Sequence, residues 1–390
     1  MNFDEIIDRR GNKSTKWGGM ADFTGVTAQD GLPMWIADMD FRAPDFLQDA
    51  VREILETGEY GYFVGMDGFR DSVCWWMETR HGWHIQPDWI FTTYGLGNAI
   101  GMCLQAYTDP GDEVIIFTPV YHEFTRKIWN AGRVVHECPL AIQDGVYHMD
   151  FEAYEAQMTG RERALLFCSP HNPAGKIWTP DEQRELVAFC NRHNLILISD
   201  EIHHDLVYPG QKHTPLLNAA PEAQDRVIML TSSSKTFNTA GSRLGSVIIP
   251  DPDLRSRFAA VMRALDVSPN LLGARLTEAA YSPAGAEWVD ALTSYLDGNQ
   301  QAFCDGMAQI PGLKPMPMQS TYLAWIDFEN IGMDMSEVVR RVQQDARIAP
   351  SIGAEFGTGG ENFLRFNIGT ARANVTESVA RIQDAFSDLQ

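Results

Sequence analysis

Short apolar runs recur through the middle of the chain, without the alternation expected of strands that have one exposed face. Such runs are typical of strands buried on both faces. The runs are 113-EVIIFT-118, 163-RALLFC-168, 195-LILIS-199, 227-VIMLT-231 and 245-GSVII-249. Between them, 180-PDEQRELVAFCNRHN-194 starts with proline and acids and continues with apolar residues at helical spacing. The pattern predicts a parallel α/β sheet with crossover helices.

The pattern changes after about residue 270, where long helical stretches precede a mixture of strands and helices. Apolar segments at 321-TYLAWIDF-328 and 363-FLRFNIG-369 predict strands, and 335-MSEVVRRVQQDA-346 predicts a helix. This mixture favours a compact α+β unit, which the N-terminal arm is expected to join.

The length of 390 residues exceeds the usual ceiling for one domain, so we expect two. The large α/β domain is predicted over residues 45–280, and the small α+β domain over residues 1–44 and 281–390. A hydrophobic content of 44% against 21% charged residues excludes a disordered chain. A ligand site is expected in the cleft between the domains.

Charge and apolar patterning restrict the partners and the location. The net charge of −21 argues against nucleic acid, because binding to a phosphate backbone needs clustered lysine and arginine. The start, 1-MNFDEIIDRR-10, lacks the apolar core of a secretory signal, and no stretch is long enough to span a membrane. We therefore expect a cytoplasmic protein.

The cysteines and histidines do not show the spacing of a metal site. Six cysteines lie singly among apolar residues, which favours reduced, buried thiols. They are Cys74, Cys103, Cys138, Cys168, Cys190 and Cys304. The adjacent His203 and His204 point apart on any regular element, and no third ligand accompanies them in the sequence. We expect no metal.

Two residues carry the strongest chemical signal. Lys235 lies among small hydroxyl residues in 231-TSSSKTFNTAGSRLG-245, and such an amine can form an imine with an aldehyde cofactor. Asp200 closes the apolar run that starts at Leu195, where a carboxylate can hold a protonated ring nitrogen. Together they indicate pyridoxal phosphate.

Three loops at predicted strand ends add candidates. In 92-TTYGLGNAIGMCLQA-106, Gly95 and Gly97 turn a strand into a helix whose first N–H groups can hold a phosphate; an ordinary turn is the alternative. Asn172 precedes a proline in the turn after another strand, a position that also occurs in plain turns. Tyr121 follows a strand, where its ring can stack on a flat cofactor or simply pack at the surface.

The order of these residues along the chain resembles the class I/II aminotransferase superfamily of pyridoxal phosphate enzymes, over nearly the whole length. Five further segments resemble the subgroup of cystathionine β-lyase-type C–S lyases. They are 16-KWGG-19, 34-MWIADMDF-41, 60-YGYFVGMDGFRDSV-73, 200-DEIHHDL-206 and 234-SKTFNTAG-241. The resemblance implies the fold of pyridoxal-phosphate-dependent transferases: a large domain with a mainly parallel seven-stranded sheet between helices, and a smaller α+β domain.

The resemblance also assigns roles at the cofactor ring. It implies that Lys235 is the Schiff-base lysine and the general base and acid at the substrate Cα and at cofactor C4′, with Tyr121 as the second catalytic residue, stacked on the ring. Asp200 is implied to pair with the pyridinium nitrogen, and Asn172 to donate to the phenolic O3′. His203 stands where other branches of the superfamily place a cofactor-binding tyrosine.

For the cofactor phosphate, the resemblance implies Ser232, Arg243 and the backbone at Leu96 and Gly97. Tyr62 matches the family's tyrosine that reaches in from a second subunit. A homodimer with shared active sites is therefore expected.

For the substrate, the resemblance implies that Arg365 binds the α-carboxylate, since a planar guanidinium pairs two oxygens at once. An intramolecular salt bridge is the alternative for this arginine. The backbone near Ala37 is expected to approach the same carboxylate.

Two positions depart from the lyase subgroup. Arg243 is typical of aminotransferases, and lyases of this subgroup often lack it. His122 stands where lyase relatives often carry a second tyrosine.

The expected function is a C–S β-lyase that cleaves cystathionine, cysteine or cysteine S-conjugates to pyruvate, ammonia and a thiol. An aminotransferase of a neutral or aromatic amino acid is the alternative, because both reactions start with removal of the Cα proton. A catalytically silent, regulatory pyridoxal phosphate protein is a hypothesis of another class, disfavoured by the presence of Lys235, Asp200 and Arg365 together.

Overall fold

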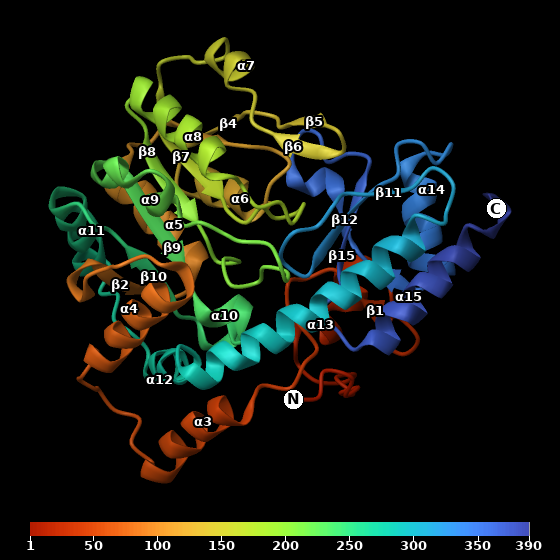
Figure 1. Cartoon of the computed structure of the whole chain (residues 1–390), viewed down its shortest axis with the longest axis horizontal. Helices are drawn as coiled ribbons and strands as arrows, with labels where there is room; N and C mark the ends of the chain where they lie inside the picture. Colours follow the sequence, from red (N-terminus) through yellow and green to blue (C-terminus); the bar gives the residue numbers. More distant parts are fainter. Residues whose placement is uncertain (390) are drawn as a thin grey trace.

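The computed structural model describes residues 1–389. Within them, a seven-stranded sheet in the order β2-β10-β9-β8-β7-β3-β4 has helices on both faces (Figure 1). Its strands are β2 (Ile90–Thr93), β3 (Glu113–Ile116), β4 (Val134–Glu137), β7 (Glu162–Cys168), β8 (Ile196–Asp200), β9 (Val227–Thr231) and β10 (Gly245–Ile248). All five apolar runs of the sequence are strands of this sheet, and the predicted fold class is confirmed.

The strands lack an alternation of apolar and polar residues because an apolar core lies against each face of the sheet. In β3, Val114 and Ile116 pack with α5 (Leu96–Tyr107) and α11 (Pro252–Ala264), whereas Ile115 packs in the core that includes α8 (Pro180–Arg192). Because side chains alternate between the faces of a strand and both faces are buried, apolar residues occupy consecutive positions.

Helix α8 begins where the sequence predicts. Thr179 and Glu182 form a reciprocal capping box, and Pro180 occupies the first turn, where its missing N–H costs nothing. The helix ends at Arg192, and Asn194 adopts a left-handed conformation before β8.

One strand corrects the prediction of a parallel sheet. β10 is antiparallel to both β2 and β9, whereas the other neighbouring pairs are parallel. The segment after β9 forms only the short α10 (Ser233–Thr236) and a 3₁₀ turn at Ala240–Ser242. The chain therefore re-enters the sheet at the same end of the strands from which it left.

A second, antiparallel sheet forms from the C-terminal part of the chain in the order β11-β12-β15-β14. Its strands are β11 (Lys314–Pro315), β12 (Leu323–Asp327), β14 (Ser351–Ile352) and β15 (Phe363–Asn367). The N-terminal arm contacts this part of the chain: β1 (Leu32–Pro33) pairs in parallel with β13 (Ile348–Ala349). The predicted helix at 335–346 is shorter: α14 (Met335–Arg340) continues as a π-helical turn, Arg341–Asp345.

Two long helices complete this half of the molecule. α13 (Pro283–Met307) runs from α12 (Leu271–Ala280) towards α15 (Arg372–Ala385), which packs along it (Figure 1). The helices in the other half of the molecule include α3 (Asp45–Thr57) and α4 (Asp67–His81).

Across residues 1–389, no helix combines the length and the apolarity needed to cross a bilayer.

Candidate active site

Three of the predicted site residues come from neighbouring strands of the large sheet. β7, β8 and β9 run parallel. Asp200 is the last residue of β8, Asn172 lies in the turn after β7, and Lys235 lies in α10 after β9. Because the carboxyl ends of parallel strands meet at one edge of a sheet, the topology gathers these three side chains.

Lys235 lies against the N-terminal arm. Its Nζ donates a hydrogen bond to the carbonyl oxygen of Ala37 at 2.6 Å. Burial lowers the pKa of the amine to about 8, while the carboxylates of Asp38 and Asp200 act in the opposite direction. A larger fraction of this amine is therefore neutral near pH 7 than of an ordinary lysine. The predicted approach of Ala37 to a substrate carboxylate stays a prediction.

Asp200 is buried and has spare capacity to accept hydrogen bonds. Its Oδ1 accepts from the backbone N–H of Ile202 at 3.2 Å. Burial raises the pKa of the carboxyl to about 7, although the Ile202 N–H and the Lys235 amine favour the ionised form. A carboxylate in this situation is stabilised by a cationic N–H placed against it.

Arg365, in the centre of β15, is buried and held by neutral oxygens. Nη1 donates to Asn172 Oδ1 at 2.9 Å, and Nη2 donates to the Trp35 carbonyl at 2.8 Å and to Ser351 Oγ at 3.1 Å. Its guanidinium also lies 4.8 Å from the ring centre of Phe356.

The charge of Arg365 is not neutralised by an acid. Within residues 1–389 no carboxylate pairs with it and its Nε has no partner, so the intramolecular salt bridge weighed as the alternative is wrong. Burial lowers the pKa of the guanidinium to about 10, which still leaves it charged at neutral pH. An uncompensated buried cation of this kind is suited to bind a carboxylate. The sequence marks the segments around Trp35 and Ser351 as candidate walls of the substrate site, but assigns neither residue a contact with Arg365.

Aromatic and imidazole side chains form the walls of the candidate site. Tyr121 and His122 contact edge to face, with ring centres 5.1 Å apart, and burial raises the pKa of Tyr121 to about 12. His203 is buried with its ring centre 6.1 Å from that of Tyr322. Burial, with the nearby cations of Lys235 and Arg365, lowers the pKa of His203 to about 3, so its imidazole is neutral. His122 is also neutral, because burial lowers its pKa to about 4.

The start of α5 fits an anion. Gly95 precedes it with a φ of 84°, and no side chain caps the helix, so the N–H groups of Leu96 and Gly97 face outward without intrahelical partners. A side chain at Gly97 would meet Lys127, because a Cβ there would lie 3.1 Å from the Cε of that lysine.

Of the other two predicted phosphate ligands, Ser232 is engaged and Arg243 is free. Ser232 Oγ donates to the Leu244 carbonyl at 2.7 Å and accepts from the Ser234 N–H at 3.1 Å. Arg243 is exposed, and its side chain forms no ion pair within the described chain. The strand that follows it approaches α5, since a Cβ at Gly245 would lie 2.7 Å from a methyl group of Leu96.

Tyr62 is the predicted residue that the single chain does not bring to the site. Its side chain is fully exposed in the loop between α3 and α4. Its predicted role in a second subunit therefore stays a prediction.

A buried ion pair that the sequence analysis missed fixes the arm over Lys235. Lys16 is fully buried, and its Nζ donates to Asp40 Oδ2 and to the Asp38 carbonyl, each at 2.7 Å. The segment 16-KWGG-19 was noted for its resemblance alone, with no role for the lysine.

The donor set fits pyridoxal phosphate. It offers an amine at Lys235, a buried carboxylate without a cationic partner at Asp200, and free backbone N–H groups at Leu96 and Gly97. These match the aldehyde, the ring nitrogen and the phosphate of that group. Arg365 remains for an amino-acid carboxylate.

Comparisons with known proteins agree with this geometry. The family model described as aminotransferase class I and II matches residues 40–382. Cystathionine beta-lyase PatB of Bacillus subtilis is 37% identical, over 99% of this chain and 100% of its own length. The structure of cystalysin from Treponema denticola, which contains a pyridoxal 5′-phosphate cofactor, has a TM-score of 0.94 and 35% identity, covering 100% of this chain and 99% of that one.

A further solved relative is the PLP-bound C–S lyase from Staphylococcus hominis, with a TM-score of 0.90 and 28% identity, over 99% of this chain and 98% of that one. The resemblance drawn from the ordered motifs is thus confirmed along the whole chain. The protein belongs to the class I and II aminotransferase family of pyridoxal-phosphate-dependent enzymes.

Proposed function

We propose that this protein is a pyridoxal-phosphate-dependent C–S β-lyase. Its substrate class is an L-amino acid with sulfur on Cβ, such as cystathionine, cysteine or a cysteine S-conjugate. The observation that carries amino-acid chemistry is the buried Arg365, which faces the same site as Lys235 and has no carboxylate partner in residues 1–389. The names of the cystathionine beta-lyase and C–S lyase relatives support sulfur as the leaving group.

Each residue has a defined task in this proposal. Bound pyridoxal phosphate supplies an electron sink that makes the substrate Cα–H acidic. Asp200 keeps a proton on the ring nitrogen, because its buried carboxylate gains most from a cationic neighbour. Lys235 removes the Cα proton, and its lowered pKa keeps part of the amine neutral for that step. Arg365 holds the α-carboxylate, and Tyr121 supports the ring face.

The remaining cofactor contacts follow the sequence assignments. Asn172 already orients Arg365 through its Oδ1, which leaves its Nδ2 to donate to the cofactor O3′. The N–H groups of Leu96 and Gly97, the Ser232 hydroxyl and Arg243 would hold the phosphate, with Ser232 turning from its present acceptor. The neutral His203 lies beside the ring site.

The overall reaction balances as a β-elimination followed by hydrolysis. The Cα–H and Cβ–S bonds break, and the thiolate leaves with a proton. Water then hydrolyses the Cα–N bond, so its oxygen becomes the carbonyl oxygen of pyruvate and the nitrogen leaves as ammonia. Transamination would begin with the same removal of the Cα proton by Lys235, so residues at the ring alone do not choose between the routes.

The decisive assay uses purified holoenzyme with cystathionine or a cysteine S-conjugate and no keto-acid acceptor. We expect pyruvate, ammonia and thiol in equal amounts over many turnovers, and no turnover in K235A. K13A, at an exposed lysine, serves as the matched control and should keep full activity. Amino-group transfer to a keto acid without pyruvate release would instead establish an aminotransferase, and binding without turnover would establish a silent binder.

We infer further that the working enzyme is a homodimer in which Tyr62 of each subunit completes the phosphate site of the other. The full exposure of Tyr62, close to the exposed Tyr60 and Val64, supports an interface at this loop.

The domain division and the location belong to the same proposal. Residues 45–280 would form the cofactor-binding domain, and residues 1–44 with 281–390 the small domain; the pairing of β1 with β13 supports the second grouping. The free state of all cysteines supports a reducing compartment, and we infer the cytoplasm.

A further inference from the structure

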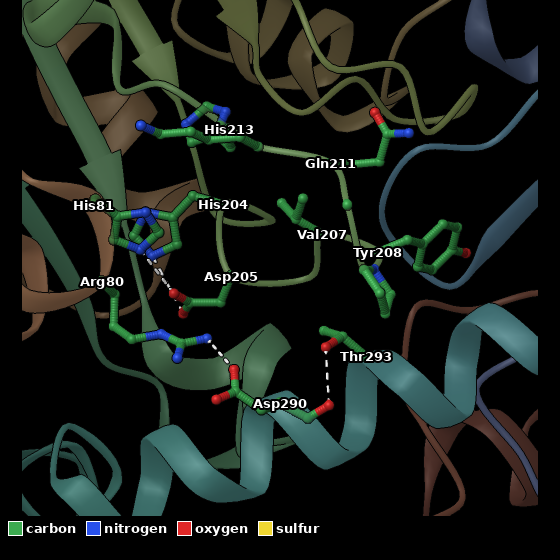
Figure 2. A pocket seen from close by; sticks show the side chains of 13 residues that line it. Arg80, His81, His204, Asp205, Val207, Tyr208, Gln211, His213, Asp290 and Thr293 are labelled. Atoms are coloured by element: carbon green, nitrogen blue, oxygen red, sulfur yellow. Dashed lines mark hydrogen bonds and ion pairs between the residues drawn. The ribbon is translucent and has the colours of Figure 1, made fainter.

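A second group of ionisable side chains is buried next to α10, where Thr236 contacts Asp205. His81 ends α4, His204 and Asp205 follow β8, and His213 lies in the loop before α9 (Leu216–Ala219). All four are buried or nearly so and line a pocket of about 370 Å³ (Figure 2). The proposed reaction uses none of them.

Three of these side chains converge. His81 Nε2 lies 2.8 Å from Asp205 Oδ1, and His204 Nε2 lies 3.3 Å from Asp205 Oδ2. The two imidazole rings stack with centres 4.2 Å apart, so both Nε2 atoms face the carboxylate, as Figure 2 shows. The sequence offered no third ligand beside His204, but the fold supplies His81 from a helix more than a hundred residues earlier.

The spacing of these atoms suits a small tetrahedral metal ion. Zinc binds imidazole nitrogen and carboxylate oxygen at about 2.0–2.2 Å, which places neighbouring ligand atoms of a tetrahedron roughly 3.3 Å apart. The distances of 2.8 and 3.3 Å from Asp205 to His81 and His204 lie close to that value. Binding would require the two stacked rings, whose planes meet at 22°, to turn so that both Nε2 lone pairs point at one ion.

The electrostatics of the group also suit a cation. Asp205 is buried and pairs with no lysine or arginine in residues 1–389.

The surroundings supply the supports that metal ligands usually have. Trp76 Nε1 donates to Asp205 Oδ1 at 2.9 Å, and Thr236 Oγ1 donates to Oδ2 at 2.8 Å. These bonds orient the carboxylate without involving either imidazole. The pocket leaves room for water as a further ligand.

We propose that His81, His204 and Asp205 form a zinc-binding site, completed by water from the pocket. Two imidazoles and one carboxylate favour zinc over magnesium or calcium, which prefer oxygen ligands alone. The site adjoins the catalytic lysine through Thr236, the residue after Lys235, and through His204, the residue after His203. It is independent of the reaction proposed above.

Metal retention by the holoenzyme tests the proposal. The protein is incubated with zinc chloride, desalted and analysed for zinc, and titration calorimetry with zinc chloride gives the affinity. We expect about one zinc ion per wild-type chain. Loss of an outer hydrogen-bond partner already lowers metal affinity about 10- to 100-fold, so removal of a ligand in H81N or H204N should weaken binding by more than about 100-fold.

A matched control comes from the other acid and histidine cluster of the chain. His136 Nδ1 lies 2.9 Å from Glu113 Oε2 and 3.1 Å from Glu162 Oε1. H136N should retain as much zinc as the wild type. Absence of zinc from the wild-type protein, equal retention by H204N, or loss confined to H136N would each overturn the proposal.

Cobalt substitution keeps the test decisive if a histidine variant does not fold. Wild-type holoenzyme loaded with cobalt chloride should develop the intense visible bands of four-coordinate Co²⁺ with nitrogen ligands. A weak spectrum like that of hexahydrated Co²⁺ would overturn the proposal.

Discussion

Arg365 and Asn172 are joined by a 2.9 Å hydrogen bond from Nη1 to Oδ1, which links the second sheet to the loop after β7 of the large sheet. The bond orients a buried guanidinium that has no carboxylate partner in the part of the chain described. The residues proposed to bind the substrate carboxylate and the cofactor ring are thus held against each other by this bond.

The first prediction concerns Arg365. R365K keeps the charge but loses the planar fork, and with it the charge-assisted hydrogen bonds to a carboxylate. Such bonds contribute about 1.5–3 kcal/mol, so kcat/KM for β-elimination should fall about 10- to 100-fold. Steady-state kinetics measures this change. R347K, at the exposed ion pair with Asp30, is the control and should match the wild type.

The second prediction concerns the pH dependence of the apoprotein. The pKa of Asp200 is raised to about 7 in the folded state, above its unfolded value, so its contribution to stability is present at low pH and lost as pH rises through 7. D200N has no charge to bury. Its unfolding free energy relative to wild type should therefore increase by about 2–3 kcal/mol from pH 5 to pH 8.

Urea unfolding of both cofactor-free proteins at the two pH values measures that difference. A difference that does not change with pH would show that Asp200 is ionised throughout. Addition of cofactor should reverse the order at pH 8, because only the aspartate can pair with a protonated ring nitrogen.

The third prediction concerns the buried pair of Lys16 and Asp40. K16M removes the ammonium, but Asp40 keeps hydrogen bonds from Arg9 and from Trp17 Nε1, both at 2.9 Å. We expect the free energy of unfolding to fall by about 3 kcal/mol, the lower end for breaking a buried pair. Activity should fall too, because this pair positions the segment whose Ala37 carbonyl contacts Lys235. Thermal unfolding and turnover measure both effects, with the exposed K13M as control.

The fourth prediction tests shared active sites. Y62A and K235A should each be nearly inactive as homodimers. After unfolding and refolding as an equal mixture, half of the dimers are mixed and each contains one site with both native residues, so about a quarter of wild-type activity should return. If Tyr62 serves its own subunit, the mixture stays inactive.

Much of the fold could be predicted because its signal is local. Strands buried on both faces are apolar at consecutive positions, so β3, β7, β8 and β9 are visible as short apolar runs. The direction of β10 was not visible, because it depends on how the segment after β9 folds back rather than on the composition of the strand itself.

The residues of the candidate site also differ in whether the sequence alone could identify them. Lys235 and Asp200 were accessible from the sequence, because an amine among hydroxyl residues and a carboxylate at a strand end each carry their chemistry with them. Ser351 and the Trp35 carbonyl were not, since a serine or a backbone oxygen acquires its role only from the guanidinium placed beside it.

The sequence by itself determined the fold class and the cofactor, because hydrophobic periodicity and reactive side chains are properties of short segments. The tertiary structure alone decided that Arg365 lacks an acidic partner, that Lys16 anchors the arm, and that His81 meets His204 at Asp205. The physical reason is that burial and pairing arise between segments far apart in the chain, and their effects on charge depend on distances that no local pattern contains.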